Sequence, residues 1–247
     1  MSDARALLLE GIEILCKNNS DIDELISPNK DRIAVLLCMY INEIETFNPA
    51  YGLVGTNDTK ELIIKHILDS LAPLGIILKL LKERILPRTA NQGFGGSFTG
   101  EDEKINIADA GSGAGLPGIP LAIAMPDTSF TLIERMGRRA GFLLNTKAVL
   151  SLANVNIDES ELEKVTGSQF GMITFRAFAP VEPKLLKTLC RVCKPDGIIA
   201  AYKGRREKIE EEIAALNTSN MDCEIIPYTV PFLDEERNLL VFKNSQI

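Results

Sequence analysis

The spacing of apolar residues predicts helices over the first third of the chain. Apolar positions recur at intervals of three and four residues, the period of an amphipathic α-helix. Helices are expected at 1–17, 31–47, 59–71 and 74–86. Asp58 or Thr59 can cap the third helix, and Pro87 ends the fourth. The segments 27–30 and 48–52 carry Pro and Asn and are expected to be turns.

From position 105 onward, short apolar runs alternate with helical segments, which is typical of a parallel α/β sheet. Strands are expected at 105–109, 129–134, 155–158, 171–175, 198–203, 224–230 and 238–243. Helices are expected at 118–125, 138–152, 182–192 and 206–216, with a turn at 194–197. Only about seven residues join the last two strands, too few for a parallel crossover, so these strands should be antiparallel.

Glycine and small polar residues crowd positions 88–104 and separate the two patterns. We therefore predict an N-terminal helical region at 1–90, a flexible loop or linker at 91–104 and an α/β domain at 105–247.

Composition excludes several classes of protein. The 247 residues are 45% apolar and 25% charged, as in globular proteins, and no apolar run is long enough to span a membrane. Five scattered cysteines suit a reducing cytoplasm rather than a disulfide scaffold. The single histidine, His66, makes a Ser-His-Asp triad or a multi-histidine metal site improbable, and no metal is expected.

The net charge of −7 is unevenly distributed. Segments 79–91, 135–147 and 203–208 carry +3, +4 and +3, so the remainder carries −17. These segments either form a local face that binds phosphates or are three separate solvated surfaces. Charge alone favours the solvated surfaces.

A glycine-rich turn after the first predicted strand is the clearest chemical signal. Gly111, Gly113 and Gly115 follow Asp109 at G-x-G-x-G spacing, and Leu116 stands where a dinucleotide fingerprint has its third glycine. Pro117 removes a backbone donor where that fingerprint meets a pyrophosphate. A nucleoside cofactor without phosphate, such as S-adenosylmethionine, fits better, and a plain structural turn is the alternative. Glu134 ends the second strand, where an acid can accept hydrogen bonds from ribose hydroxyls.

Several motifs together are similar to a known family. They are 109–125 (DAGSGAGLPGIPLAIAM), 130–134 (FTLIE), 138–143 (RRAGFL), 176–180 (RAFAP), 201–204 (AYKG) and 65–71 (KHILDSL). On these motifs the chain resembles the bacterial 16S rRNA guanine-N7 methyltransferases, also called glucose-inhibited division protein B. The resemblance covers about residues 40 to 245.

This resemblance implies a class I S-adenosylmethionine-dependent methyltransferase: a Rossmann-like, mostly parallel seven-stranded sheet that ends in an antiparallel hairpin, with an N-terminal helical extension. The implied reaction is methylation of N7 of a guanine in the 530 loop of 16S rRNA (position 527 in ribosomal numbering). By motif, Gly111 and Leu116 match the cofactor loop and Glu134 the ribose-binding acid. Leu162 and Glu163 match the pair that flanks the adenine, and Arg176 the arginine after the fourth strand.

Guanine N7 carries a lone pair and no proton, so methyl transfer to it requires alignment and no general base. We expect Arg176 to position the cofactor and guanine, with Asp109, Gly113 and Gly115 completing the cofactor site. Candidate phosphate contacts are Lys203, Arg138 and Arg139. Phe178 or Tyr202 could stack on the base, and the alternative for each is a core residue. The expected partner is 16S rRNA or the small ribosomal subunit, with a monomeric protein in the cytoplasm.

Three other patterns are better interpreted as structural features than as functional sites. The stretch 48–51 (NPAY) is similar to an amino-methyltransferase motif, but a turn is the better interpretation. Cys190 and Cys193 are expected to be core residues rather than a metal or redox pair. His66 and Asp69 are expected to form a hydrogen-bonded pair on the helix surface that fixes this helix on the catalytic domain, with RNA contact as the alternative.

Three other functions remain open. A methyltransferase of small molecules or proteins would lack a basic face around the cofactor mouth, whereas an RNA enzyme should gather the three basic segments there. A nicotinamide dehydrogenase would bind NAD in place of S-adenosylmethionine. A non-catalytic ribosome-binding module would keep the fold, and only an assay would distinguish it.

Overall fold

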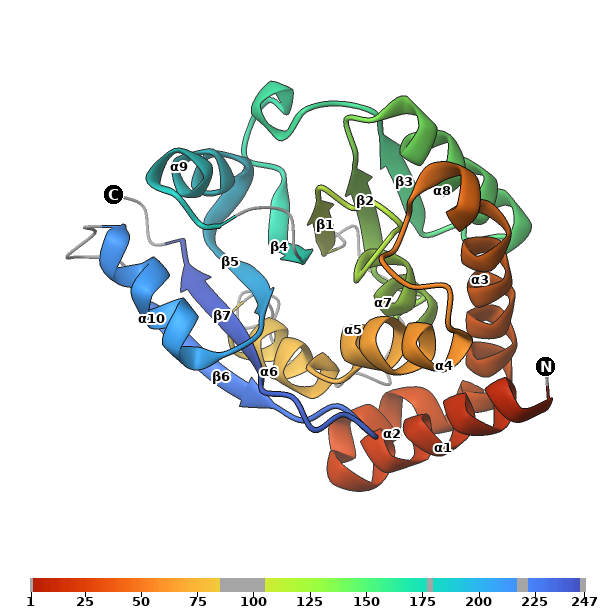
Figure 1. The fold of residues 1–247 in the computed structure, drawn as a ribbon. Helices are drawn as coiled ribbons and strands as arrows, with labels where there is room; N and C mark the ends of the chain where they lie inside the picture. The colour runs from red at the N-terminus through yellow and green to blue at the C-terminus, as the bar shows by residue number, and fades with distance from the viewer. Residues whose placement is uncertain (1, 85–104, 177–179, 217–221, 245–247) are drawn as a thin grey trace.

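A seven-stranded sheet forms the centre of the molecule (Figure 1). The computed structural model describes residues 2–84, 105–176, 180–216 and 222–244. The strands are β1 (Asn106–Ala110), β2 (Ser129–Ile133), β3 (Val155–Asp158), β4 (Phe170–Arg176), β5 (Cys193–Lys203), β6 (Cys223–Tyr228) and β7 (Arg237–Lys243). Their order is β3-β2-β1-β4-β5-β7-β6. Neighbours among β1 to β5 are parallel, and β7 is antiparallel to both β5 and β6, which confirms the predicted closing hairpin.

Helices cover both faces of this sheet. The N-terminal region supplies α1 (Ser2–Asn18), α2 (Ser20–Ile26), η1 (Ser27–Asn29), α3 (Lys30–Tyr51), α4 (Thr59–Leu62), η2 (Ile63–Leu68), α5 (Asp69–Leu71) and α6 (Leu74–Arg84). The later helices are α7 (Gly118–Ala124), α8 (Gly137–Val149), η4 (Leu162–Lys164), α9 (Pro183–Val192) and α10 (Arg206–Ala215). The N-terminal helices, α7 and α8 lie on one side of the sheet, and α9 and α10 on the other (Figure 1).

Two expected turns are wrong. Residues 48–51 form the last turn of α3, which ends at Gly52 with a left-handed φ of 59°. The Asn48 side chain ties this helix end to the next loop, donating to Thr56 O (2.9 Å) and accepting from Val54 N–H (2.9 Å). Residues 194–197 belong to β5 as an irregularity in its register with β4.

The helix α2 was not expected from the sequence. Its N-cap is Asn19, whose side-chain oxygen accepts from Ile22 N–H at 3.1 Å. Asp58 caps α4 as predicted, accepting from Glu61 N–H at 2.7 Å. The helix that begins at Thr59 changes to a π-helix over Ile63–Leu68, and such segments are frequent at functional sites.

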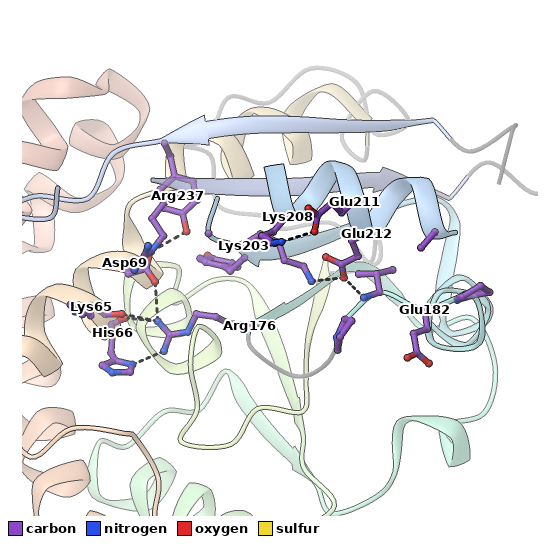
Figure 2. Close-up of a pocket in the computed structure, with 17 residues that line it drawn as sticks. Lys65, His66, Asp69, Arg176, Glu182, Lys203, Lys208, Glu211, Glu212 and Arg237 are labelled. Atoms are coloured by element: carbon purple, nitrogen blue, oxygen red, sulfur yellow. Dashed lines mark hydrogen bonds and ion pairs between the residues drawn. The ribbon is translucent and has the colours of Figure 1, made fainter. Parts of the chain in front are cut away.

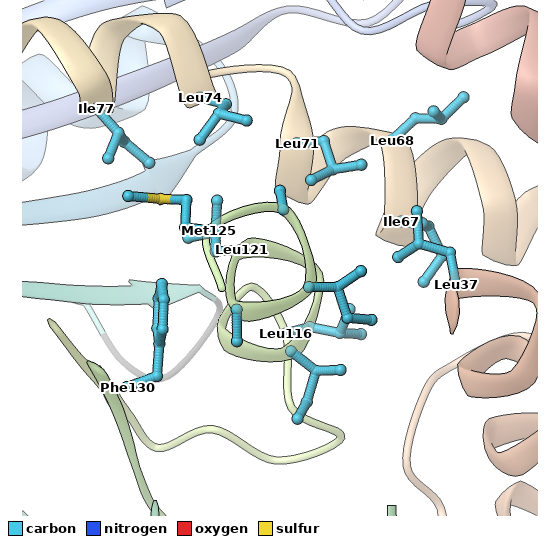
Figure 3. Close-up of a cluster of buried hydrophobic side chains, with 14 of the residues drawn as sticks. Leu37, Ile67, Leu68, Leu71, Leu74, Ile77, Leu116, Leu121, Met125 and Phe130 are labelled. Carbon is cyan, nitrogen blue, oxygen red and sulfur yellow. The ribbon is translucent and has the colours of Figure 1, made fainter. Parts of the chain in front are cut away.

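Side chains alternate between two hydrophobic cores because successive strand residues point to opposite faces. One core joins Phe130 and Met172 of the sheet to α7 and the N-terminal helices (Figure 3). The other joins Ile173 and Phe175 to α9 and α10. The N-terminal helices thus share a core with the sheet, while the predicted linker at 91–104 lies outside the described residues. In the described part of the chain, no helix has the length and apolar character needed to cross a membrane.

Candidate active site

The glycine turn follows β1 and contains three left-handed glycines. Gly111, Gly113 and Gly115 have φ values of 67°, 59° and 93°, which side chains disfavour. The N–H groups of Gly111 and Ser112 both donate to Ile133 O, at 2.9 and 3.0 Å. A Cβ atom on Gly113 would approach only Gly111 O, at 3.9 Å. The turn is therefore tied to the end of β2, and its backbone at Gly113 is open to a ligand.

Asp109 shapes the turn from within. Its buried Oδ2 accepts hydrogen bonds from Ser112 Oγ at 2.6 Å and Gly118 N–H at 3.0 Å. Within the described structure, its Oδ1 is buried without a hydrogen-bond partner. Burial raises the pKa of Asp109 to about 6, although the hydrogen bond from Ser112 opposes that effect.

The first turn of α7 has no spare backbone donor for an anion. Gly118 N–H already donates to Asp109, Ile119 N–H donates to Gly115 O at 2.7 Å, and Pro120 has no N–H. Phosphate groups bind helix N-termini through free N–H groups. This end of α7 therefore suits a cofactor without phosphate.

Tyr40 of α3 supports the turn from the other side. The fully buried Tyr40 hydroxyl donates to Ala114 O at 2.6 Å. A Cβ atom on Gly115 would come within 3.1 Å of this hydroxyl and 2.6 Å of Ile119 Cγ1. The absence of a side chain at Gly115 therefore lets the N-terminal region reach the predicted cofactor loop, a contact that no sequence pattern indicated.

Glu134 lies against the glycine turn. Its Oε2 accepts from Gly113 N–H at 2.9 Å and its Oε1 from Met136 N–H at 2.8 Å. A carboxylate has about four lone-pair sites, so each oxygen can accept a further hydrogen bond. The structure thus brings the predicted ribose-binding acid and the predicted turn together.

Leu162 and Glu163 lie in η4, after β3 and at the same edge of the sheet as the turn. Leu162 is buried in the core that contains Ala110 and Ile133, and Glu163 is exposed. Arg191 donates to the carbonyl oxygens of Leu162 and Glu163, at 3.4 and 3.0 Å. Arg191, which no sequence motif marked, fixes this segment to α9.

Arg176 ends β4 and connects the sheet to the helix that carries His66. Its Nη1 donates to Lys65 O at 3.2 Å, His66 O at 3.5 Å and Asp69 Oδ2 at 3.1 Å. Its Nη2 lies 3.0 Å from His66 Nδ1. β4 neighbours β1 at the point where the strand order reverses, the usual ligand site of open α/β sheets. Arg176 is therefore placed beside both β1, which leads into the glycine turn, and the cavity described below.

The predicted surface pair of His66 and Asp69 is wrong. Asp69 is 4% exposed and accepts hydrogen bonds from Arg176 and from the Tyr228 hydroxyl at 3.0 Å, with Arg237 Nε at 3.5 Å. Both side chains contact Arg176, and the π-helical turn makes ordinary α-helical spacing a poor guide here. Tyr228 and Arg237 come from the closing hairpin, and no local signal marked them.

A cavity of about 1,100 Å³ lies beside Arg176 (Figure 2). Five basic and four acidic side chains line it: Lys65, Arg176, Lys203, Lys208 and Arg237, and Asp69, Glu182, Glu211 and Glu212. Lys203 is already paired with Glu212, at 2.7 Å between largely buried groups. Of the three basic segments, only 203–208 contributes described residues to the lining of this cavity, so the expected convergence of the three segments is not seen there.

The remaining RNA-binding candidates have different surroundings. Arg138 is exposed at the start of α8, and Arg139 Nη2 donates to Gly52 O at 3.3 Å. Tyr202 is 4% exposed, and its hydroxyl donates to Ser70 O at 3.0 Å. Its ring packs against Tyr228, so Tyr202 is a core residue, the second of the two roles expected for it. Phe178 lies outside the described residues.

The five cysteines are free thiols. Cys193 is buried, and burial raises its pKa to about 12, so this thiol is a core group rather than a nucleophile. Among the described residues, no cluster of three or more His, Cys, Asp or Glu side chains could hold a metal.

The strand order, together with a glycine turn and a following helix whose first turn has no spare N–H donor for phosphate, defines a class I S-adenosylmethionine-dependent methyltransferase. A family model described as rRNA small subunit methyltransferase G (GidB) matches residues 94–241. A ribosomal RNA small subunit methyltransferase G from Treponema denticola is 38% identical over 86% of this chain and 87% of that protein. Its counterpart from Treponema pallidum (strain Nichols) is 36% identical over 95% and 92%. The chain belongs to the rRNA small subunit methyltransferase G family.

Proposed function

We propose that this protein transfers the methyl group of S-adenosylmethionine to N7 of a guanine in the 530 loop of 16S rRNA, in the cytoplasm. The observation that carries the proposal is the position of Arg176. This residue ends β4, the strand next to β1 and its glycine turn, and it also lines a cavity large enough for a nucleobase.

The residues around the glycine turn fit this cofactor. The first turn of α7 has no spare donor for a phosphate, and the cofactor has none. Glu134 can accept hydrogen bonds from ribose hydroxyls, and Leu162 and Glu163 of η4 would hold the adenine. Gly111, Gly113, Gly115 and Leu116 form the loop that the cofactor would touch, and Asp109 fixes its shape.

The chain's own contribution to the reaction is alignment. The bound cofactor supplies a methyl group on a sulfonium, and guanine N7 offers a lone pair without a proton. Reacting atoms need to be held at about 3–3.5 Å in line, which accelerates reactions without acid–base chemistry. Arg176, held by Asp69, His66 and two carbonyl groups, has the fixed geometry that such positioning requires.

The proposal is tested by nucleoside mass spectrometry of 16S rRNA from cells with and without the gene. The loss of one 7-methylguanosine in the 530 loop is expected, restored by the wild-type gene. An unchanged amount of 7-methylguanosine would remove the assignment.

The cofactor site is tested by calorimetry with S-adenosylmethionine. Glu134→Gln should weaken binding about tenfold, because it loses one charge-assisted acceptor for the ribose hydroxyls, worth roughly 1.5 kcal/mol. Glu224→Gln is the matched control, at an exposed position of β6 on the edge of the sheet away from the glycine turn, and should bind as the wild type does. Equal affinity of wild type and Glu134→Gln would contradict the ribose assignment.

A further inference from the structure

The contact between His66 and Arg176 determines which nitrogen of the imidazole carries the proton. Arg176 Nη2 lies 3.0 Å from His66 Nδ1. A guanidinium group has only donors, so Nδ1 must accept and has no proton. The hydrogen of a neutral imidazole is then on Nε2.

The surroundings keep this imidazole neutral. Burial and, next, the charge of Arg176 lower the pKa of His66 to about 4, while Glu61 opposes this shift. A protonated ring would carry a hydrogen on Nδ1, pointed at the Arg176 guanidinium. At neutral pH, His66 is therefore an uncharged donor through Nε2–H.

This donor is available to a ligand. His66 is half-buried in the wall of the cavity next to Arg176 (Figure 2). Within the described structure, its side chain makes a hydrogen bond through Nδ1, and Nε2 has no partner there. A polar group on a cavity wall with one side fixed and the other unused is suited to recognise a substrate atom.

We infer that His66 selects guanine by donating Nε2–H to O6 of the target base; this inference rests on the proposed function. Guanine presents N7 and O6 as neighbouring acceptors on one edge, whereas adenine presents N7 beside an N6 amino donor. A donor at this position pairs with O6 and opposes the adenine amino group.

A neutral donor also suits the reaction. During methyl transfer, positive charge develops on the purine ring beside O6. A cation at O6 would oppose that charge, while an uncharged N–H group can hold the base without the same repulsion. His66 is thus a specificity-determining residue that is distinct from the positioning residue Arg176.

The test is a substrate–protein double-mutant cycle on small-subunit particles reconstituted with ligated 16S rRNA. The target guanine is replaced by 2-aminopurine, which keeps N7 and the 2-amino group but lacks O6. The wild-type protein should lose roughly 5- to 150-fold in kcat/KM with this base, the cost of leaving the Nε2–H donor without a partner. In His66→Asn, the side-chain oxygen can still accept from Arg176, but nothing reaches the position of Nε2. Its ratio of guanine to 2-aminopurine rates should fall to within about twofold of one.

Controls separate this role from folding. Glu210→Gln, at an exposed position of α10 outside the cavity lining, should keep the wild-type ratio. Thermal unfolding and S-adenosylmethionine binding are measured for each variant. If His66→Asn does not fold, His66→Ser is measured in its place; its short side chain does not reach the position of Nε2, so it should lose the discrimination to the same extent.

Two results would overturn the inference: an undiminished ratio in His66→Asn, or in His66→Ser where that variant replaces it, and no penalty for 2-aminopurine in the wild type. Failure of the wild type to form 7-methylguanosine on unmodified particles would instead overturn the proposed function.

Discussion

Asp69 gives the sharpest test of the side-chain network, because its single carboxylate contacts two arginines and a tyrosine. Asp69→Asn preserves the shape and one acceptor oxygen but removes the negative charge. Asp69 oxygens lie 3.1 Å from Arg176 Nη1 and 3.5 Å from Arg237 Nε. The two arginine side chains are only 14% and 18% exposed, so water compensates poorly for the lost charge.

Removing one partner of a buried ion pair commonly costs about 3–5 kcal/mol. The cost here should be smaller, about 2–3 kcal/mol, because remaining groups still compensate part of the buried charge. Arg176 keeps the carbonyl oxygens of Lys65 and His66, and Arg237 keeps Glu235 at 3.0 Å. Methyl transfer should fall as well, since Arg176 loses the partner that holds its orientation.

The assay is urea unfolding at pH 7 with an unchanged m-value. Glu210→Gln is the matched control, because it removes a pair with Arg206 whose side chains are 58% and 54% exposed. That change should cost less than about 0.5 kcal/mol. If Asp69→Asn were as stable as Glu210→Gln and fully active, the buried network would not hold Arg176 as we argue.

Two further predictions concern Asp109 and Lys203. The pKa of Asp109 is raised to about 6, so the stabilising effect of its protonation is present below pH 4 and lost as pH rises through 6. The difference in unfolding free energy between Asp109→Asn and the wild type should therefore change in favour of the variant by on the order of 2 kcal/mol between pH 4 and 7, measured in urea titrations. A difference that does not vary with pH would mean that the pKa of Asp109 is not raised. Lys203→Ala should weaken RNA binding. It should also make the fall of log affinity with log salt concentration less steep, by about 1 in the magnitude of the slope. An unchanged slope in filter-binding assays would show that Lys203 remains with Glu212.

The sequence predicted most of the α/β part because each signal there was local. Apolar runs gave the strands, and the short connection between β6 and β7 required them to be antiparallel. Gly and Pro marked both ends of α7. Glu134 and the glycine turn could be paired in advance because parallel strands end at one edge of the sheet.

The errors lie where distant contacts decide the structure. Asp69 looked like a surface acid, yet its partners Arg176 and Tyr228 are 107 and 159 residues away. Tyr202 looked able to stack on a base, but Ser70 and Tyr228 hold it in the core. A seven-residue helix such as α2 is too short for a clear apolar period, and the final turn of α3 runs through a proline.

The hydrogen bond from Tyr40 to Ala114 has a consequence for how the molecule can be divided. A chain shortened to begin at β1 would leave the Ala114 carbonyl without its donor and open the space behind Gly115. It would also remove apolar side chains of the N-terminal helices from the core that contains Phe130 and Leu121. The helices before the sheet therefore support the glycine turn and the core beneath it, and we expect a fragment without them to lose the shape of that turn.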